Sequence, residues 1–480
     1  MTRTGPVALA LAVMLSGCLG TTDADDATAE GGDPSVDVPS LTPLEEPVLV
    51  SPPGNRIAEF MVARNPHDPD HLVTAFGDYD SPGGVLNCAF AVSFDGGRTW
   101  RVSEPVPGFS GPYLQFDGWV DFDEHGGVHA ICLRQAGPGA TTEAWPYHFR
   151  SRDGGLSWGE AARIPTDPPE RSTDKSVLGV GRDGTIYGAV SGMVGRSRDN
   201  GTTWDPMRPV ASGFSVLNGI VEDNGGTVHL LGLGGGQIKI QRTSDGGASW
   251  NETAFGRWQI PPGYNDQNRW VEQRPWTALP DLGHDPVTDD LYVVHQAWDE
   301  AYGGYRLYAY RSTDHGASYE AIPVPEFPSQ SCTDPCHVTH PAVGFDLEGR
   351  VGLTVQLTQD GGHLKEVWFT ASSDQGQSWA EPVLLSRTDG IAQDGWSNPG
   401  AFTPQPDNAE AIAAGVADDP TTAHNVAAGI ALTTAVQELQ MRWNGEYWGL
   451  TASSHGFVAM WVEHGGDGKP QLWSQVVAVG

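Results

Sequence analysis

The chain has 480 residues, with 62 Gly, 36 Pro and a formal net charge of −33. This charge argues against nucleic-acid binding, because phosphate groups would be repelled, and no nucleotide or flavin fingerprint is present, so we expect no cofactor. Many Gly and Pro residues between short apolar runs, with little helical periodicity, favour an all-β fold.

The N-terminus has the features of a lipoprotein signal peptide over residues 1–17. Arg3 gives a positive charge, an apolar stretch follows, and Leu15–Cys18 (LSGC) resembles a lipobox. This resemblance implies cleavage before Cys18 and lipidation of its sulfur; an ordinary signal peptide that contains a cysteine is the alternative. Residues 18–44 are acidic and small, which predicts a disordered tether. We therefore expect an extracytoplasmic protein that is anchored to a membrane through its lipid alone.

An eight-residue pattern, Ser/Thr-x-Asp-x-Gly-x-Ser/Thr-aromatic, occurs six times between strand-like runs, at spacings of 46 to 69 residues. In each copy the Asp can accept hydrogen bonds from amides of its own turn, and the Gly can adopt a positive φ. The closing aromatic residue can pack against a neighbouring sheet. Such recurrence indicates a repeat architecture. The copies are Ser93–Trp100, Ser151–Trp158, Ser197–Trp204, Thr243–Trp250, Ser312–Tyr319 and Ser372–Trp379.

These octamers resemble the Asp-box, or bacterial neuraminidase repeat, of the sialidase superfamily, and the resemblance covers nearly all of the chain after residue 45. It implies a β-propeller in which each octamer lies between the third and fourth strands of a blade. It does not by itself imply sialidase activity, because the same turn occurs in propellers of other function.

Three strand-like runs precede each octamer and define six blades. In chain order we expect strands at 56–64, 71–77 and 87–93; 118–122, 128–133 and 147–151; 176–181, 185–191 and 193–197; 216–222, 227–232 and 237–243; 277–282, 291–297 and 305–312; and 342–347, 351–357 and 366–372. A fourth strand follows each octamer. Insertions are expected at 255–274 and at about 387–446, the second with one helix at 421–439.

A seventh set of strands, at 449–453, 457–463 and 471–478, has neither an octamer nor a fourth strand. Near the N-terminus, Glu46–Ser51 (EPVLVS) almost repeats the fourth strand of blade six, Glu381–Ser386 (EPVLLS). We therefore expect this N-terminal strand to complete the last blade and to close the ring. The prediction is a monomeric seven-bladed propeller over residues 45–480; six blades, the number in sialidases, is the alternative.

Four cysteines remain besides Cys18, in an exported chain that permits disulfides. We expect the pairs Cys88–Cys132 and Cys332–Cys336 among the three possible connectivities. The alternative to the second pair is a zinc site with the spacing C-x3-C-H-x2-H. Its ligands would be Cys332, Cys336, His337 and His340. Because export favours the disulfide, we expect no metal there.

Candidate binding residues gather on one predicted face of the ring. Loops that lead into each first strand, and loops that join second to third strands, converge on the face opposite the octamers. Carboxylates and aromatic rings suit the hydroxyl groups and faces of sugars, and arginine suits a carboxylate ligand. By blade position the candidates are Arg171, Arg269, Arg274, Trp276 and Trp298. Other charged residues of these loops include Asp117, Lys175, His337 and His340.

The family resemblance singles out one arginine. Asn55–Ala58 (NRIA) is similar to the Arg-Ile-Pro motif that opens the first blade of sialidases, with Ala in place of Pro. The resemblance implies that Arg56 binds the carboxylate of a sialic acid. A sialidase needs three such arginines, and only this first one has motif support.

The resemblance also suggests catalytic residues. Glu446–Leu450 (EYWGL) is similar to the segment that opens the last sialidase blade, where a tyrosine is the nucleophile. This implies Tyr447 as nucleophile, Glu446 as the base that activates it, and Asp78 or Asp80 in a first-blade loop as general acid and base.

Two functions from different classes remain open. The first is a surface-anchored exo-glycosidase that acts on terminal sugars of glycans, sialic acid or another acidic sugar among them. The second is a non-catalytic propeller that binds a glycan or a partner protein, or that scaffolds the cell envelope. Three guanidinium groups that converge near Tyr447 would favour the first.

Overall fold

The computed structural model describes residues 38–81, 86–109, 114–135, 144–167, 175–211, 213–214, 216–258, 279–329, 336–358, 364–389, 448–464 and 469–480. The predicted signal peptide with Cys18, and the predicted helix at 421–439, lie outside these ranges. Within them, no helix is long and apolar enough to cross a membrane.

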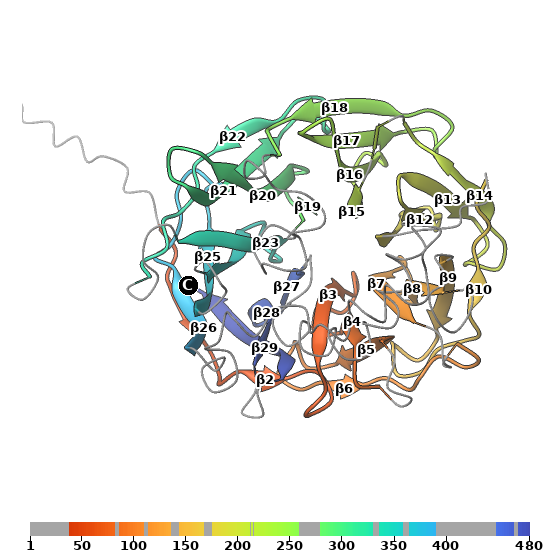
Figure 1. Cartoon of the computed structure of the whole chain (residues 1–480), viewed down its shortest axis with the longest axis horizontal. Coiled ribbons are helices and arrows are strands. Elements are labelled where there is room, and N and C mark those ends of the chain that lie inside the picture. The colour runs from red at the N-terminus through yellow and green to blue at the C-terminus, as the bar shows by residue number, and fades with distance from the viewer. Residues whose placement is uncertain are drawn as a thin grey trace, which may run out of the picture. The chain divides into compact units, whose positions relative to one another are not determined.

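Seven antiparallel sheets form a ring (Figure 1), so the predicted count of seven blades is confirmed and the alternative of six is wrong. Blades one to three consist of β3 (Ile57–Arg64), β4 (Leu72–Asp78), β5 (Asn87–Ser93) and β6 (Arg101–Val102); β7 (Gln115–Phe122), β8 (Val128–Gln135), β9 (Ala144–Ser151) and β10 (Ala162–Arg163); and β11 (Ser176–Val180), β12 (Ile186–Val190), β13 (Met193–Ser197) and β14 (Asp205–Pro209).

Blades four to six consist of β15 (Val216–Glu222), β16 (Val228–Gly234), β17 (Gln237–Thr243) and β18 (Asn251–Phe255); β19 (Asp281–His284), β20 (Leu291–Asp299), β21 (Gly304–Ser312) and β22 (Glu320–Ile322); and β23 (His337–Phe345), β24 (Val351–Thr358), β25 (Leu364–Ser372) and β26 (Val383–Asp389). Blade seven combines β27 (Leu450–Ser453), β28 (Gly456–His464) and β29 (Pro470–Val479) with β1 (Leu41–Pro43) and β2 (Val48–Leu49) from the other end of the described chain.

The first strand of every blade lies nearest the axis, and first strands of neighbouring blades contact one another (Figure 1). Second strands such as β4, β16 and β24 are buried along their whole length, because a neighbouring sheet covers each of their faces. Such strands read as continuous apolar runs. We call the face where first strands begin the first-strand face, and the opposite one, with the octamer turns, the octamer face.

The N-terminal strand closes the ring as predicted. Val48 pairs with Ser474 and Leu49 with Trp473, and the Val50 amide donates to the Leu472 carbonyl at 2.9 Å. The structure adds β1, which pairs antiparallel with the far end of β29. β1 lies within the segment 18–44 that was expected to be a disordered tether, so the propeller begins before the expected boundary at residue 45.

The octamer turns are held by one recurring set of hydrogen bonds. In the first copy the Gly97 amide donates to Ser93 Oγ at 2.9 Å, and the Thr99 amide donates to Asp95 Oδ1 at 2.9 Å. Gly97 has a φ of 89°, as the reversal requires. Burial alone would raise the pKa of Asp95, but hydrogen bonds from Thr99 and Ser93 hold that pKa below its usual value. The same pair of amide bonds recurs in the other five copies.

Removing one of these carboxylates should destabilise its blade modestly. We expect Asp95→Ala to lower the free energy of unfolding by about 1–2 kcal/mol, because the Thr99 amide and two hydroxyl groups lose their acceptor. Chemical denaturation measures the change, with the exposed Glu104→Ala as control. Equal midpoints for the two variants would contradict a structural role for the turn.

Candidate functional site

Unusual backbone conformations recur at the first-strand face. Pairing registers shift near the start of β3, β7, β15 and β23. The residues with positive φ at these shifts are Glu59 (52°), Asp117 (53°), Gly219 (116°) and His340 (50°), and Lys175 (59°) directly precedes β11. Non-glycine residues adopt this conformation at a cost of about 1–3 kcal/mol, and such strain is concentrated at functional sites. The recurrence shows that the first strands of these blades begin in a similar way, although Asn200, Asp289, His315 and Gln375 on the octamer face also have positive φ.

Three of these strained residues form a charged cluster across blades one, two and three. Lys175 Nζ lies 3.6 Å from Glu59 Oε1 and 3.7 Å from Asp117 Oδ1. The Lys175 amide also donates to Asp117 Oδ2 at 2.8 Å. Each residue is less than a tenth exposed, so the cluster places one cation between two carboxylates near the axis. Asp117 and Lys175 belong to the face predicted from the sequence, whereas Glu59 was missed.

Arg56 is held by Asp80. Its Nε donates to Asp80 Oδ1 and Oδ2 at 3.0 and 3.1 Å, and its backbone amide donates to Oδ2 at 3.1 Å. Lys469 Nζ donates to the same carboxylate at 3.0 Å. Burial alone would raise the pKa of Asp80, but the bonds from Arg56 and Lys469 lower it. Asp80 therefore stays ionised and orients Arg56, which makes it a poor proton donor.

Asp78 has the opposite character. It ends β4 and is only 4% exposed. Asn55 Nδ2 donates to its two oxygens at 3.1 and 2.9 Å, and the Asp80 amide donates to Oδ1 at 2.9 Å. Burial raises the pKa of Asp78, and these hydrogen bonds offset the effect only in part. A carboxyl group with a raised pKa can hold a proton and act as a general acid.

Aromatic side chains near this face pack against protein. Trp448 is 1% exposed, and its ring lies 4.8 Å from that of His340 and 5.8 Å from that of Phe60. Trp298 packs near Tyr305 at a ring distance of 5.4 Å. Among the predicted site residues, those outside the described ranges are Arg171, Arg269, Arg274, Trp276, Glu446 and Tyr447.

Three cysteines are disulfide-bonded in the described chain. Cys88 on β5 is joined to Cys132 on β8, which links blades one and two in the pairing favoured above. Cys336 is also disulfide-bonded, and its partner lies outside the described residues, as does Cys332. A disulfide sulfur cannot bind zinc as a thiolate, and His337 Nδ1 already accepts the Tyr305 amide at 3.1 Å. The alternative of a zinc site at Cys336 is therefore wrong.

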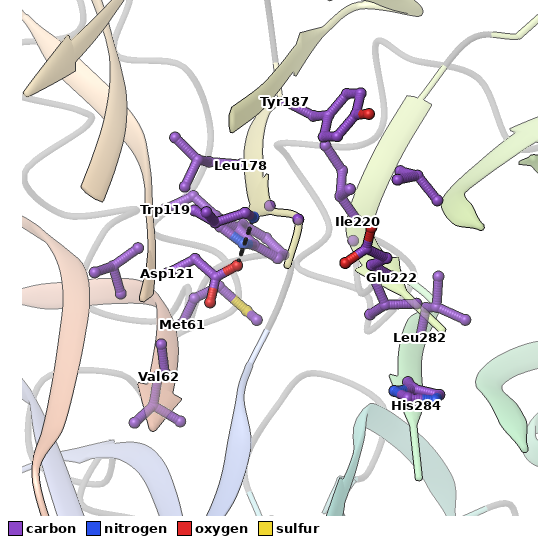
Figure 2. Close-up of a pocket in the computed structure, with 18 of the residues that line it drawn as sticks. Met61, Val62, Trp119, Asp121, Leu178, Tyr187, Ile220, Glu222, Leu282 and His284 are labelled. Carbon is purple, nitrogen blue, oxygen red and sulfur yellow. Dashed lines mark hydrogen bonds between the residues drawn. The ribbon is translucent and has the colours of Figure 1, made fainter. Parts of the chain in front are cut away.

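A pocket of about 300 Å³ lies on the axis between first strands. Figure 2 shows Asp121 and Glu222 on opposite sides of the pocket, with Leu282 and then His284 below Glu222. These residues come from the ends of β7, β15 and β19, so the pocket lies toward the octamer face and away from Asp78. The sequence gives no sign of this pocket, because the candidate residues that it offers gather on the first-strand face.

Two carboxyl groups at this pocket connect neighbouring blades. Asp121 Oδ2 accepts the Val180 amide at 2.9 Å (dashed in Figure 2), and Asp281 Oδ2 accepts the Val343 amide at 2.9 Å. Asp121 keeps some exposure to the pocket, but protein surrounds it on the other sides. Burial raises the pKa of each carboxyl to about 7.

No protein-family model and no curated protein matches this chain. Solved structures that are similar to this chain include a protein of unknown function from Dyadobacter fermentans. The two proteins are 17% identical, the match covers 68% of this chain and 97% of the Dyadobacter protein, and the TM-score is 0.43. A Hadza microbial sialidase shows 16% identity over 66% of this chain and 65% of its own, with a TM-score of 0.45. The Trypanosoma rangeli sialidase shows 14% identity over 70% of this chain and 60% of its own, with a TM-score of 0.45. This chain thus spans less than two thirds of either sialidase, and at such identities a shared activity does not follow.

Proposed function

We propose that the protein is an exported exo-glycosidase that acts on a terminal acidic sugar, with its site on the first-strand face. The observation that carries this proposal is Asp78, a buried carboxyl group whose pKa is raised by burial. It lies beside Asp80, whose carboxylate accepts hydrogen bonds from the cations Arg56 and Lys469. A proton donor next to fixed positive charge suits the cleavage of a glycosidic bond in an anionic substrate.

In the proposed reaction, Asp78 donates its proton to the glycosidic oxygen as the bond to the anomeric carbon breaks. On the resemblance to sialidases, Tyr447 Oη attacks that carbon while Glu446 takes the tyrosine proton. Water then displaces the tyrosine: the Asp78 carboxylate takes a proton from the water, and Glu446 returns its proton to Tyr447 Oη. Arg56, oriented by Asp80, would bind the carboxylate of the sugar.

The test is hydrolysis of a fluorogenic sialoside and of a panel of other acidic glycosides. We expect Asp78→Asn to lower kcat by about 10²–10⁴-fold with little change in KM, because only proton transfer is lost. Asp80→Asn should instead raise KM, because Arg56 loses its orienting partner. The exposed Asp68→Asn, in the turn between β3 and β4 on the octamer face, is the control. Turnover by Asp78→Asn at the wild-type rate would show that Asp78 is not the general acid.

A non-catalytic glycan-binding propeller is the second candidate. It is favoured because the cations on the first-strand face are already paired with carboxylates of the protein. Asp80 contacts both Arg56 and Lys469, and Lys175 lies between two carboxylates. Positive charge that is already matched within the protein attracts an anionic ligand less strongly. Binding on a glycan array that is retained in Asp78→Asn, without turnover of any glycoside by the wild type, would support this candidate.

Export and lipid anchoring are part of the proposal. They rest on the lipobox-like Leu15–Cys18 and on the disulfide between Cys88 and Cys132, since disulfides persist in oxidising compartments. Metabolic labelling with a radioactive fatty acid tests the anchor, and Cys18→Ser should abolish the label. An unlabelled wild-type protein would leave an ordinary signal peptide as the explanation.

A further inference from the structure

Three side chains from three separate turns meet on the octamer face, between blades four and five. Asp223 lies in the turn after β15, Asp289 in the turn after β19, and His315 in the octamer turn after β21. One ligand-type atom of each lies within 4.8 Å of the other two. None of these residues belongs to the site proposed above, which lies on the opposite face.

The spacing of these atoms matches the edges of a metal coordination sphere. His315 Nδ1 lies 3.1 Å from Asp223 Oδ2 and 3.6 Å from Asp289 Oδ2. With Zn²⁺ bonds to nitrogen and oxygen of about 2.0–2.2 Å, the edge of a tetrahedron is about 3.4 Å. The two measured distances bracket this value, and the third edge, between the two carboxylates, is no longer than 4.8 Å.

Other residues also hold the two carboxylates, as supporting groups do in metal sites, and one of them contacts the same Asp223 oxygen as His315 does. His229 Nε2 lies 3.0 Å from Asp223 Oδ2, and the Thr227 amide donates to Asp223 Oδ1 at 2.8 Å. His284 Nε2 lies 2.9 Å from Asp289 Oδ1. Asp223 is fully buried, so bulk water does not hydrate its charge, whereas the Asp289 side chain is 24% exposed.

Equivalent turns in blades two and six neutralise their aspartate with arginine. In blade two, Asp123 contacts His129 Nε2 at 3.1 Å and Arg150 Nη2 at 3.0 Å. In blade six, Asp346 pairs with Arg350 at 2.6 Å. In the described residues of blades four and five, by contrast, no lysine or arginine forms an ion pair with Asp223 or Asp289.

Arg182, on the neighbouring blade, does not fill this role. Arg182 donates from its side chain to Asn224 and from its backbone to Glu222. The two carboxylates therefore contact three imidazoles, those of His229, His284 and His315, but no lysine or arginine of the described residues pairs with them, in a protein of net charge −33. Closely spaced carboxylates repel each other unless a cation lies between them.

We propose that Asp223 Oδ2, Asp289 Oδ2 and His315 Nδ1 bind one divalent first-row metal ion, with Zn²⁺ as the best geometric fit. Imidazole and carboxylate together suit this class of ion. The His315 side chain is 58% exposed, so the site is open to solvent and water completes the coordination. The ion cross-links blades four and five at their turns.

The experiment titrates EDTA-treated full-length protein with Zn²⁺ by calorimetry and with Co²⁺ by visible absorption. We expect one ion per chain and a Tm that rises with added Zn²⁺. His315→Ala should weaken binding by at least about 100-fold, and His284→Ala by about 10–100-fold. The exposed His125→Ala, in the corresponding turn of blade two, is the matched control and should bind as the wild type does.

A charge-restoring variant separates a metal site from a simple ion pair. His315→Arg copies the cation that blade two places at Asp123, so it should remain stable in EDTA but lose the response to Zn²⁺. Circular dichroism confirms that each variant is folded. Absence of stoichiometric binding in the wild type, or equal binding by His315→Ala, would overturn the proposal.

Discussion

A chain that begins at Pro52 is expected to fail to form a stable monomeric propeller, whereas a chain that begins at Val38 folds normally. The first truncation removes β1 and β2 and leaves β29 as an open edge. It deletes backbone bonds such as Val50 to Leu472 and Leu44 to Val476, both of 2.9 Å, and the buried Val50 side chain.

We expect the Pro52 truncation to lose several kcal/mol, a large part of the 5–15 kcal/mol typical of folded domains. The readouts are size-exclusion chromatography and thermal unfolding, with the Val38 truncation as control. The shorter chain should aggregate or form dimers through the β29 edge. A monomer with an unchanged Tm would show that closure contributes little.

Much of the fold follows from local patterns. The octamers carry their own hydrogen-bond partners within eight residues, so Ser93, Asp95 and Gly97 predict their turn without tertiary information. The near-identity of Glu46–Ser51 and Glu381–Ser386 predicted the closing strand, because strands in equivalent positions of a propeller face equivalent neighbours.

The register shifts at the first-strand face could not be predicted. First strands were expected at 118 and 342, but β7 begins at Gln115 and β23 at His337, because each strand continues through a bulge. A bulge breaks the alternation on which strand prediction rests. Glu59 was missed for the same reason. It lies at the bulge of β3 and faces Lys175, a residue distant in sequence.

The candidate site was predictable in its residue types but not in its charge states. Asp78 and Asp80 are two residues apart and were interchangeable in the sequence. The structure separates them, because Asn55 is a neutral partner for Asp78 whereas Arg56 and Lys469 are cationic partners for Asp80. A pKa depends on such neighbours and on burial, neither of which a single sequence displays.

The second large expected effect is a change in how stability depends on pH, caused by Asp121 and Asp281. Burial raises the pKa of both from 3.8 to about 7. Between these values the folded state holds protons that the unfolded state has released. The contribution of these two carboxyl groups to the free energy of unfolding is therefore fully present below pH 3.8 and is lost as the pH rises through 7.

Two buried histidines act in the opposite sense. Burial lowers the pKa of His148 from 6.5 to about 3 and that of His295 to about 4. The unfolded state then binds protons that the folded state does not, so stability falls as the pH drops below 6.5. Between about pH 4 and pH 6.5 the two pairs of groups therefore offset each other in the wild type.

The double variant Asp121→Asn/Asp281→Asn should remove the pH dependence that comes from the two carboxyl groups and keep the one that comes from the histidines. Each substitution leaves one backbone amide with a poorer acceptor, which costs about 1–3 kcal/mol at every pH. As the pH rises from 4 to 7.5, however, the free energy of unfolding of the variant should increase relative to that of the wild type by on the order of 4 kcal/mol per site. The reason is that the variant has no carboxylate to be ionised in the folded state. Urea denaturation at several pH values gives the difference curve, in which the unchanged histidines cancel. A difference that stays constant from pH 4 to pH 7.5 would mean that both carboxyl groups ionise normally, and that the axial pocket admits enough water to solvate them.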